Sequence, residues 1–263
     1  MTSFKPGYGK VDRDYGMRLA TTPADQDGPV WMVNLMKYKE VASYADGNPS
    51  GISGKEADDR YAPTKILHEI GAEVPFFGDV AMQLLGDDVK WDRIGVVKYP
   101  TRRSFIDMQS RQDFKGKHEH KEAGMEFTFV IGCQPMDLEG VPEARDWSDV
   151  PHPPTDDDGP VVVLHVIRFV EGTDAAKMAD YERSVFPVAR EHGVRPLAWF
   201  NVEGTIMGDG RNWDQVRFNI FPSLRAFMAV AADPGRIESQ AANRDVAIAD
   251  TYAMVVRPGI NRF

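Results

Sequence analysis

One stretch of this chain occurs twice, and this repeat constrains the possible fold more than any other feature. Residues 91–105 and 213–227 both begin with Trp-Asp, continue through a predicted strand, and reach a turn made of an aromatic residue, proline and serine or threonine. Each copy carries a phenylalanine four residues after that turn, and the copies lie 122 residues apart, 213 minus 91. A strand, a turn and a helix start that recur together indicate an internal repeat.

A second matching segment extends the repeat toward the start of each half. Residues 27–30 and 158–161 both read Asp-Gly-Pro-Val, 131 residues apart, and the loop at 45–54 accounts for the larger offset. Hydrophobic patterns and turn residues then predict the order strand, helix, strand, strand, helix, strand in both halves. The expected strands are 30–37, 74–86, 91–99, 126–133, 161–169, 197–207, 213–221 and 252–257. The expected helices are 55–70, a segment capped by Thr101, 174–192 and 223–250, with breaks near Pro63 and Pro234.

This element order is typical of the ferredoxin-like unit, in which helices cover one sheet face and leave the other bare. We therefore predict an α+β fold of two tandem ferredoxin-like units packed sheet to sheet within one chain. The repeated strand-turn-helix resembles the dimeric α+β barrel superfamily, and within it the DUF1330 family, over residues 27–135 and 158–259. The resemblance implies the barrel but no single reaction, because this superfamily includes isomerases, cofactor-free monooxygenases, haem enzymes and proteins without known catalysis.

The repeat also predicts how the chain is divided. Residues 1–26 are polar and rich in glycine and proline, which favours an extended N-terminal arm that wraps the other half or a partner subunit. The first repeat covers 27–135, a proline-rich and aspartate-rich linker covers 136–157, and the second repeat covers 158–263. DUF1330 proteins usually have a single unit, so the oligomeric state of that family does not carry over directly.

Composition excludes several classes of protein. The net charge is −9 without a basic tract, which argues against nucleic acid as a partner. The chain lacks an apolar run long enough to span a membrane and lacks an apolar signal segment, so we expect a cytoplasmic protein. Cys133 is the single cysteine, so neither an intrachain disulfide nor a thiolate zinc cluster is expected, and it should have no catalytic role.

Strand alternation sorts the candidate site residues by face. In the second half, the apolar set that includes Val216, Phe218 and Ile220 is expected to pack beneath the helices. The alternate polar set is expected to converge on the barrel side, and its members are His165, Trp199, Asn201, Glu203, Arg217 and Asn219. The first half has Asn34, Gly95 and Val97 at matching places. We therefore predict one elaborated site in the second half, with the first half as its wall.

These residue types suggest acid/base chemistry on a small molecule. His165 would move a proton, Arg217 would hold a carboxylate or enolate, and Asn34, Asn201 and Asn219 would orient it. Trp199 and Phe221 would form an apolar wall, Glu203 would supply a carboxylate, and Tyr181 a hydroxyl. The alternatives are a structural Arg217–Glu203 ion pair, a core histidine at position 165 and a packing role for Tyr181, while His192 fits a cation at a helix end.

A metal site is not expected. His118 and His120 are two residues apart, and on a helix such side chains point away from each other, so a solvated helix end is favoured. Asp156, Asp157 and Asp158 lack calcium-loop spacing.

The leading hypothesis is an enzyme that needs no cofactor and acts on a partly apolar, oxygenated small molecule. Its reaction would be an isomerisation, a lyase or cyclase reaction, or a cofactor-free monooxygenation. A non-catalytic ligand-binding or assembly protein is the main alternative, with self-association through the N-terminal arm left open. A haem enzyme ranks last, and would need His165 or His192 as the iron ligand.

Overall fold

Eight antiparallel strands close into a barrel in the computed structural model, which describes residues 6–45, 47, 51–138, 146–172 and 176–263. The first half contributes β2 (Val30–Tyr38), β3 (Glu73–Leu85), β4 (Arg93–Tyr99) and β5 (Met125–Pro135). The second half contributes β6 (Val161–Phe169), β7 (Arg195–Gly208), β8 (Gln215–Phe221) and β9 (Ile248–Asn261). All eight predicted strands are therefore present.

The two halves place their strands in the same relative order, β5-β2-β4-β3 and β9-β6-β8-β7. Edge strands join them, because β3 pairs with β9 and β5 pairs with β7, each antiparallel. The prediction of halves packed sheet to sheet is thus incomplete: they also share backbone hydrogen bonds, which leaves these edges without unpaired strand groups.

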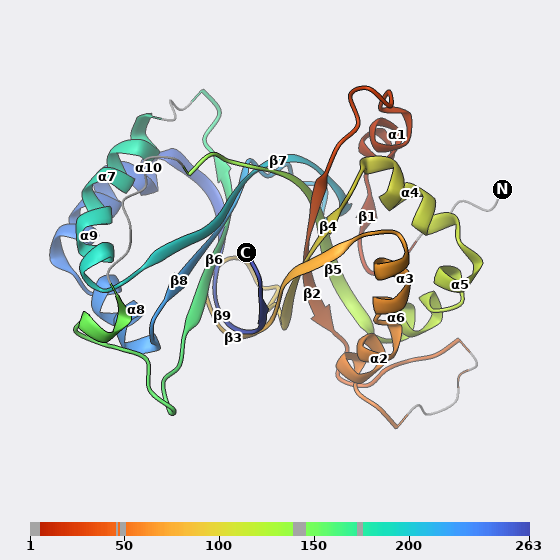
Figure 1. Ribbon diagram of the computed structural model, residues 1–263, viewed down its shortest axis with the longest axis horizontal. Coiled ribbons are helices and arrows are strands. Elements are labelled where there is room, and N and C mark those ends of the chain that lie inside the picture. Colours follow the sequence, from red (N-terminus) through yellow and green to blue (C-terminus); the bar gives the residue numbers. More distant parts are fainter. Residues whose placement is uncertain (1–5, 46, 48–50, 139–145, 173–175) are drawn as a thin grey trace.

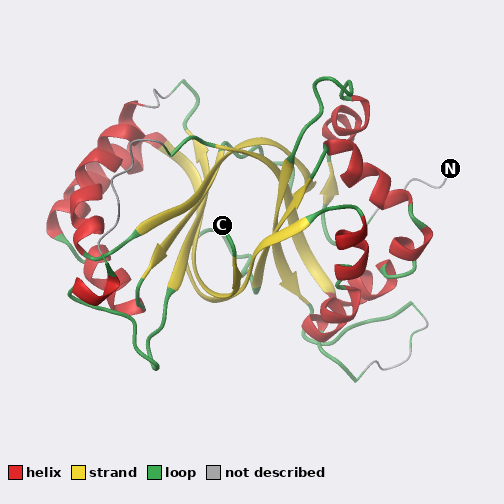
Figure 2. Cartoon of the chain, viewed as in Figure 1, coloured by secondary structure: helices red, strands yellow, loops and turns green. Residues whose placement is uncertain are grey.

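Helices lie on two opposite outer sides of the barrel (Figures 1 and 2). The first half carries α2 (Gly54–Tyr61), α3 (Thr64–Glu69), α4 (Arg102–Ser110), α5 (Gln112–Lys115) and α6 (His118–Gly124). The second half carries α7 (Ala176–Glu191), α8 (Leu224–Ala231), α9 (Pro234–Ser239), a π-helix (Gln240–Arg244) and α10 (Asp245–Ala247). The predicted breaks occur near Pro63 and Pro234, because proline lacks the amide hydrogen that a helix interior needs.

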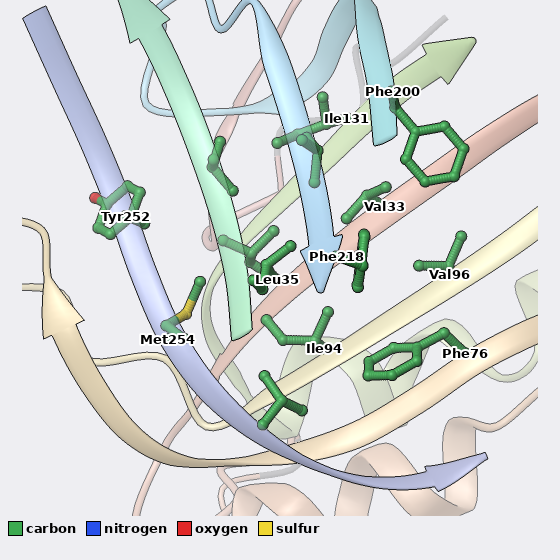
Figure 3. Packing of buried hydrophobic residues seen from close by; sticks show 14 of the residues in the cluster. Val33, Leu35, Phe76, Ile94, Val96, Ile131, Phe200, Phe218, Tyr252 and Met254 are labelled. Carbon is green, nitrogen blue, oxygen red and sulfur yellow. The ribbon is translucent and has the colours of Figure 1, made fainter. Parts of the chain in front are cut away.

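The inside of the barrel is filled with apolar side chains (Figure 3). Val33, Leu35, Ile94, Phe218 and Met254 are among the fully buried members of this cluster, and they come from both halves. The apolar alternates of each strand thus face inward. This corrects the expectation that Val216, Phe218 and Ile220 pack beneath helices, since all three belong to the barrel cluster.

The N-terminal segment is more ordered than its composition suggested. It contains β1 (Lys10–Val11), which pairs with β7, and α1 (Arg13–Thr21). Tyr15 and Leu19 of α1 are buried in the helix-side core of the first half, so the segment is not extended throughout. The pairing of β1 with β7 does agree with an arm that reaches the other half. In the predicted linker, residues 139–145 lie outside the described residues, and a 3-10 turn at Trp147–Asp149 holds Trp147 against the Gly193 carbonyl oxygen at 2.8 Å.

Candidate functional site

The predicted polar residues of β6 and β8 lie on the outer face of the barrel, beneath the second-half helices. The expectation that they face the barrel interior is wrong, because both faces of these strands are covered and the apolar set takes the inside. His165 lies opposite Arg217 in the β6–β8 ladder, as the strand pairing predicted. Phe221 is buried against Phe227 of α8, with ring centroids 5.4 Å apart.

Arg217 is the centre of a polar group on this face. Its Nε donates to Gln215 Oε1 at 2.9 Å, and its Nη1 donates to Glu182 Oε1 of α7. The guanidinium carbon of Arg217 lies over the Trp199 ring, 4.5 Å from its centroid. Trp199 Nε1 in turn donates to Asn219 Oδ1 at 3.0 Å. The structure therefore brings Arg217, Trp199 and Asn219 together as predicted.

Glu203 lies apart from this group. Its carboxylate accepts hydrogen bonds from Arg102 Nε and Nη2 at 2.8 and 2.5 Å, from Gln134 Nε2 at 2.9 Å and from Tyr15 at 3.3 Å. The ion pair with Arg217 that the sequence suggested does not form. Glu203 instead ties β7 to α1 and α4, and these partners lower its pKa against the opposing effect of burial.

Two further predicted residues, Asn201 and Tyr181, make few polar contacts with the described residues. Asn201 is exposed and accepts a hydrogen bond from Gln215 Nε2 at 3.3 Å. Tyr181 of α7 is half-buried and lies near enough to the Arg244 guanidinium to interact with it electrostatically.

A large cavity lies in the first half, between the outer face of the sheet and the helical layer. Its volume is about 820 Å³. Apolar side chains supply much of the wall, among them Met32, Val97, Phe105, Met108 and Ile206. Asn34 also lines it, and its Nδ2 donates to the Met32 carbonyl oxygen at 3.0 Å, so the side-chain oxygen remains available to a ligand. A mostly apolar cavity of this size is the usual form of a small-molecule site.

Polar groups gather at the part of the cavity formed by α2 and α6. Lys121 Nζ lies over the rings of Tyr61 and Tyr8, 5.2 and 5.7 Å from their centroids. Burial lowers the pKa of Lys121, and the Asp58 carboxylate partly offsets this effect. No residue that the structure describes accepts a hydrogen bond from Lys121 Nζ or forms an ion pair with it. Aromatic faces alone are a weak substitute for an anion.

Asp58, by contrast, has its own partners. Its Oδ2 accepts a 2.6 Å hydrogen bond from the Tyr38 hydroxyl and lies 3.7 Å from Arg93 Nη1. Arg93 also pairs with Asp59 and Asp79 at 2.7 and 2.9 Å. Burial raises the pKa of Asp58. This network braces α2 against β3 and β4, and among the described residues no ion pair links it to Lys121.

His118 also lines the cavity, which the sequence analysis missed. It stacks edge-on against Phe114 and Tyr61, at 4.8 and 6.0 Å, and burial lowers its pKa. The expectation of a solvated helix end is therefore wrong for His118, whereas His120 turns away and meets the Tyr44 hydroxyl at 2.8 Å. A signal was available, since His118 and Lys121 are three residues apart on α6 and share one helix face.

The same geometry bears on metal and haem binding. The described residues contain no group of histidine, cysteine and carboxylate side chains that could hold a metal ion. His165 and His192, the two histidines considered for haem, line neither the 820 Å³ cavity nor a smaller one of about 500 Å³ at Trp147 and Arg195. These two residues do not fit that role, and we derive no step through haem.

Comparison with known proteins identifies the fold. No family model and no curated protein matches the sequence. An anthrone oxidase-like protein superposes with a TM-score of 0.51 at 10% identity, over 89% of this chain and 92% of that one. A chlorite dismutase variant from Candidatus Nitrospira defluvii superposes with a TM-score of 0.49 at 12% identity, over 93% of this chain and 95% of that one. A protein of unknown function from Rhodopseudomonas palustris gives 0.43 at 23% identity, over 50% of this chain and 98% of its own.

The first of these matches shows that the two chains share their overall fold. None of the helices in the described part of the chain is long and apolar enough to cross a membrane.

Proposed function

We propose that this protein is an enzyme that binds a partly apolar, oxygenated small molecule in the first-half cavity and removes a proton from it without a cofactor. The observation that carries the proposal is Lys121. Its side chain faces an 820 Å³ cavity with largely apolar walls and lacks an anionic partner of its own among the described residues. A ligand that becomes an enolate or phenolate would supply that partner.

Lowering the pKa of Lys121 raises the fraction of its side chain present as the neutral amine. A neutral amine can accept a proton from a carbon next to a carbonyl group, or from a phenol, and the electron pair then stays on the substrate as an enolate or phenolate. The resulting ammonium group stabilises this oxyanion in an enclosed site, where charges interact more strongly than in water. Asn34 Oδ1 would accept a hydrogen bond from a hydroxyl group of the substrate, or from a bound water that also donates to the developing oxyanion.

An enolate is the common first intermediate of the reactions considered. Isomerisation returns the proton at another carbon, a lyase or cyclase reaction breaks or forms a bond at that carbon, and oxygenation passes electrons from the enolate to dioxygen. The name of the anthrone oxidase-like neighbour favours the last of these. Oxidation of anthrone by one dioxygen gives anthraquinone and one water, so that reaction balances without a further reductant.

The test uses anthrone as a probe substrate. Oxygen uptake and anthraquinone formation are measured for the wild-type protein and for Lys121→Met, which keeps the length of the side chain and removes the amine. We expect the variant to lose about 10²- to 10⁴-fold in kcat/KM, the usual contribution of a general base. In the wild type, kcat/KM should rise with pH through an apparent pKa below that of an ordinary lysine, and the variant should lack that rise.

Lys115→Met is the matched control, because Lys115 is exposed and lies one short helix away. It should keep the full rate and the pH profile. Binding of hydroxyanthraquinone without turnover of any probe would favour the alternative of a non-catalytic ligand-binding protein. Equal loss of activity in both variants would contradict a special role for Lys121.

The evolutionary origin of the barrel is a related proposal. We infer that residues 27–135 and 158–263 are two ferredoxin-like, DUF1330-like copies joined in tandem. The same strand order in both halves and the recurring Asp-Gly-Pro-Val and Trp-Asp segments support this inference.

A further inference from the structure

A group of cationic side chains lies where the second-half helices cover the barrel, away from the first-half cavity that Lys121 lines. Arg217 of β8, Arg236 of α9 and Arg244 of the π-helix all act on His165 of β6, and we call these three residues the arginine cluster. His165 is half-buried and makes no side-chain hydrogen bond with any described residue. Burial and the arginine cluster lower the pKa of His165 to about 3, so its imidazole is neutral at neutral pH.

Arg244 is the least satisfied member of the cluster. Its side chain is 8% exposed, and its Nη2 atom is buried without a hydrogen-bond partner among the described residues. Its Nη1 atom lies 3.4 Å from Asp245, whose side chain is 51% exposed, and burial lowers the pKa of Arg244. The residue also ends a π-helical turn, a distortion that often marks functional sites because it aims a side chain out of register.

Among the residues that the structure describes, the charges around His165 do not balance. Glu182 neutralises Arg217, while Arg236 donates to two neutral oxygens, the Ala231 carbonyl at 2.9 Å and Gln240 Oε1 at 2.8 Å. Among the described residues, the three guanidinium groups therefore have two carboxylates nearby. Glu182 is half-buried and pairs closely with Arg217, whereas Asp245 is more exposed. A buried cation without an anion costs free energy, so such an arrangement is expected where an anion binds.

We propose that the second half binds a small oxyanion, a carboxylate or a phosphate, between β6 and the π-helix. Arg244 would donate through Nη2, the neutral imidazole of His165 would donate its N–H, and Arg217 would contribute charge from across the β6–β8 ladder. Guanidinium suits this role because its planar fork matches two oxygens of a carboxylate or phosphate. The site is separate from the first-half cavity and does not depend on the function proposed for it.

Arg217 and Arg244 would have different tasks in the proposed site. Glu182 and Gln215 fix the Arg217 guanidinium, with Trp199 beneath it, so Arg217 is held in place before a ligand arrives. Tyr181 of α7 interacts electrostatically with Arg244 and would add a hydroxyl group to the site. The residues that the sequence analysis grouped here thus serve recognition of an anion rather than proton transfer.

The experiment measures thermal unfolding of the full chain in anion-poor buffer, with added inorganic phosphate or with added benzoate. Either anion that binds should raise the wild-type Tm by several degrees at saturation. Arg244→Met should abolish the rise. Without added anion, the same variant should melt at or above the wild-type temperature, because it removes a poorly paired buried cation. Arg225→Gln, at an exposed arginine of α8 paired with Asp158, should keep the full response.

A second readout does not depend on how the variant folds. The His165 ring protons are followed by NMR during titration of the wild-type protein with each anion. Binding should shift these signals and raise the pKa of His165, because an anion offsets the arginine cluster. A response to phosphate alone or to benzoate alone identifies the ligand class. Unchanged His165 signals with both anions, or a Tm rise that Arg244→Met retains, would overturn the proposal.

Discussion

His165 is a neutral histidine in a cationic setting, and this gives the protein a specific weakness toward acid. The pKa of this residue is about 3 in the folded chain and near 6.5 when unfolded, so the unfolded chain binds the proton first. Stability is unaffected above pH 6.5 and falls as the pH drops from 6.5 toward 3. Between pH 7 and pH 4 this one group should cost about 3 kcal/mol, since each pKa unit corresponds to about 1.4 kcal/mol.

Urea unfolding at both pH values checks this prediction with His165→Gln, which cannot gain a proton. The loss of stability between pH 7 and pH 4 should be smaller in the variant than in the wild type by that amount. His68→Gln, at an exposed histidine of α3, serves as the control and should follow the wild type. If His165→Gln loses stability between pH 7 and pH 4 as steeply as the wild type, the prediction for His165 is contradicted.

Residue-level prediction from the sequence grouped the side chains correctly but assigned them to the wrong face. His165 and Arg217 are neighbours, as alternation and the repeat offsets implied. Alternation cannot say which face is inside when the barrel core covers one face and helices cover the other. Lys121 was missed for a different reason: it follows two other lysines and looked solvated, whereas aromatic side chains enclose it.

At the scale of helices and strands, the recurring aspartates accept equivalent backbone hydrogen bonds in both halves. Asp92 accepts from Tyr38 N and Asp214 from Phe169 N, both at 2.7 Å, at the end of the first strand of each half. Asp27 accepts from the Arg102 amide and Asp158 from the Leu224 amide, both at 2.8 Å, at a helix start. The sequence revealed the recurrence, but only the structure shows that these carboxylates hold strand ends and helix starts.

Asp158→Ala and Asp27→Ala should therefore each lower the free energy of unfolding by about 1–2 kcal/mol, the usual cost of losing a helix-capping carboxylate. Urea unfolding at neutral pH measures the change. Asp157→Ala is a close control, because that side chain is exposed and neighbours Asp158 in the chain. The control should remain within about 0.5 kcal/mol of the wild type. A cost at position 157 as large as at 158 would show that linker charge matters, not the capping contact.

At the scale of the whole molecule, the repeat predicted the barrel, and its closure explains why neither half is complete alone. Val162, Leu164, Val216 and Phe218 of the second half are buried in a cluster that first-half residues such as Phe76 complete. The strand order and the helix positions followed from local patterns. The pairing of β3 with β9 and of β5 with β7 joins residues far apart in the chain, which no local pattern encodes.

A fragment of residues 158–263 should consequently not form a stable monomer. Its strands would expose the apolar face that the first half covers and two edges that β3 and β5 pair with, so we expect dimers or aggregates by size-exclusion chromatography. Co-expression with residues 1–157 should restore a soluble complex of one copy of each, because the missing edges and the missing face return together. The intact chain should unfold in a single transition, since the barrel core is shared. A monomeric, cooperatively folded 158–263 fragment would show instead that the halves are independent domains, and that barrel closure adds little to the stability of either.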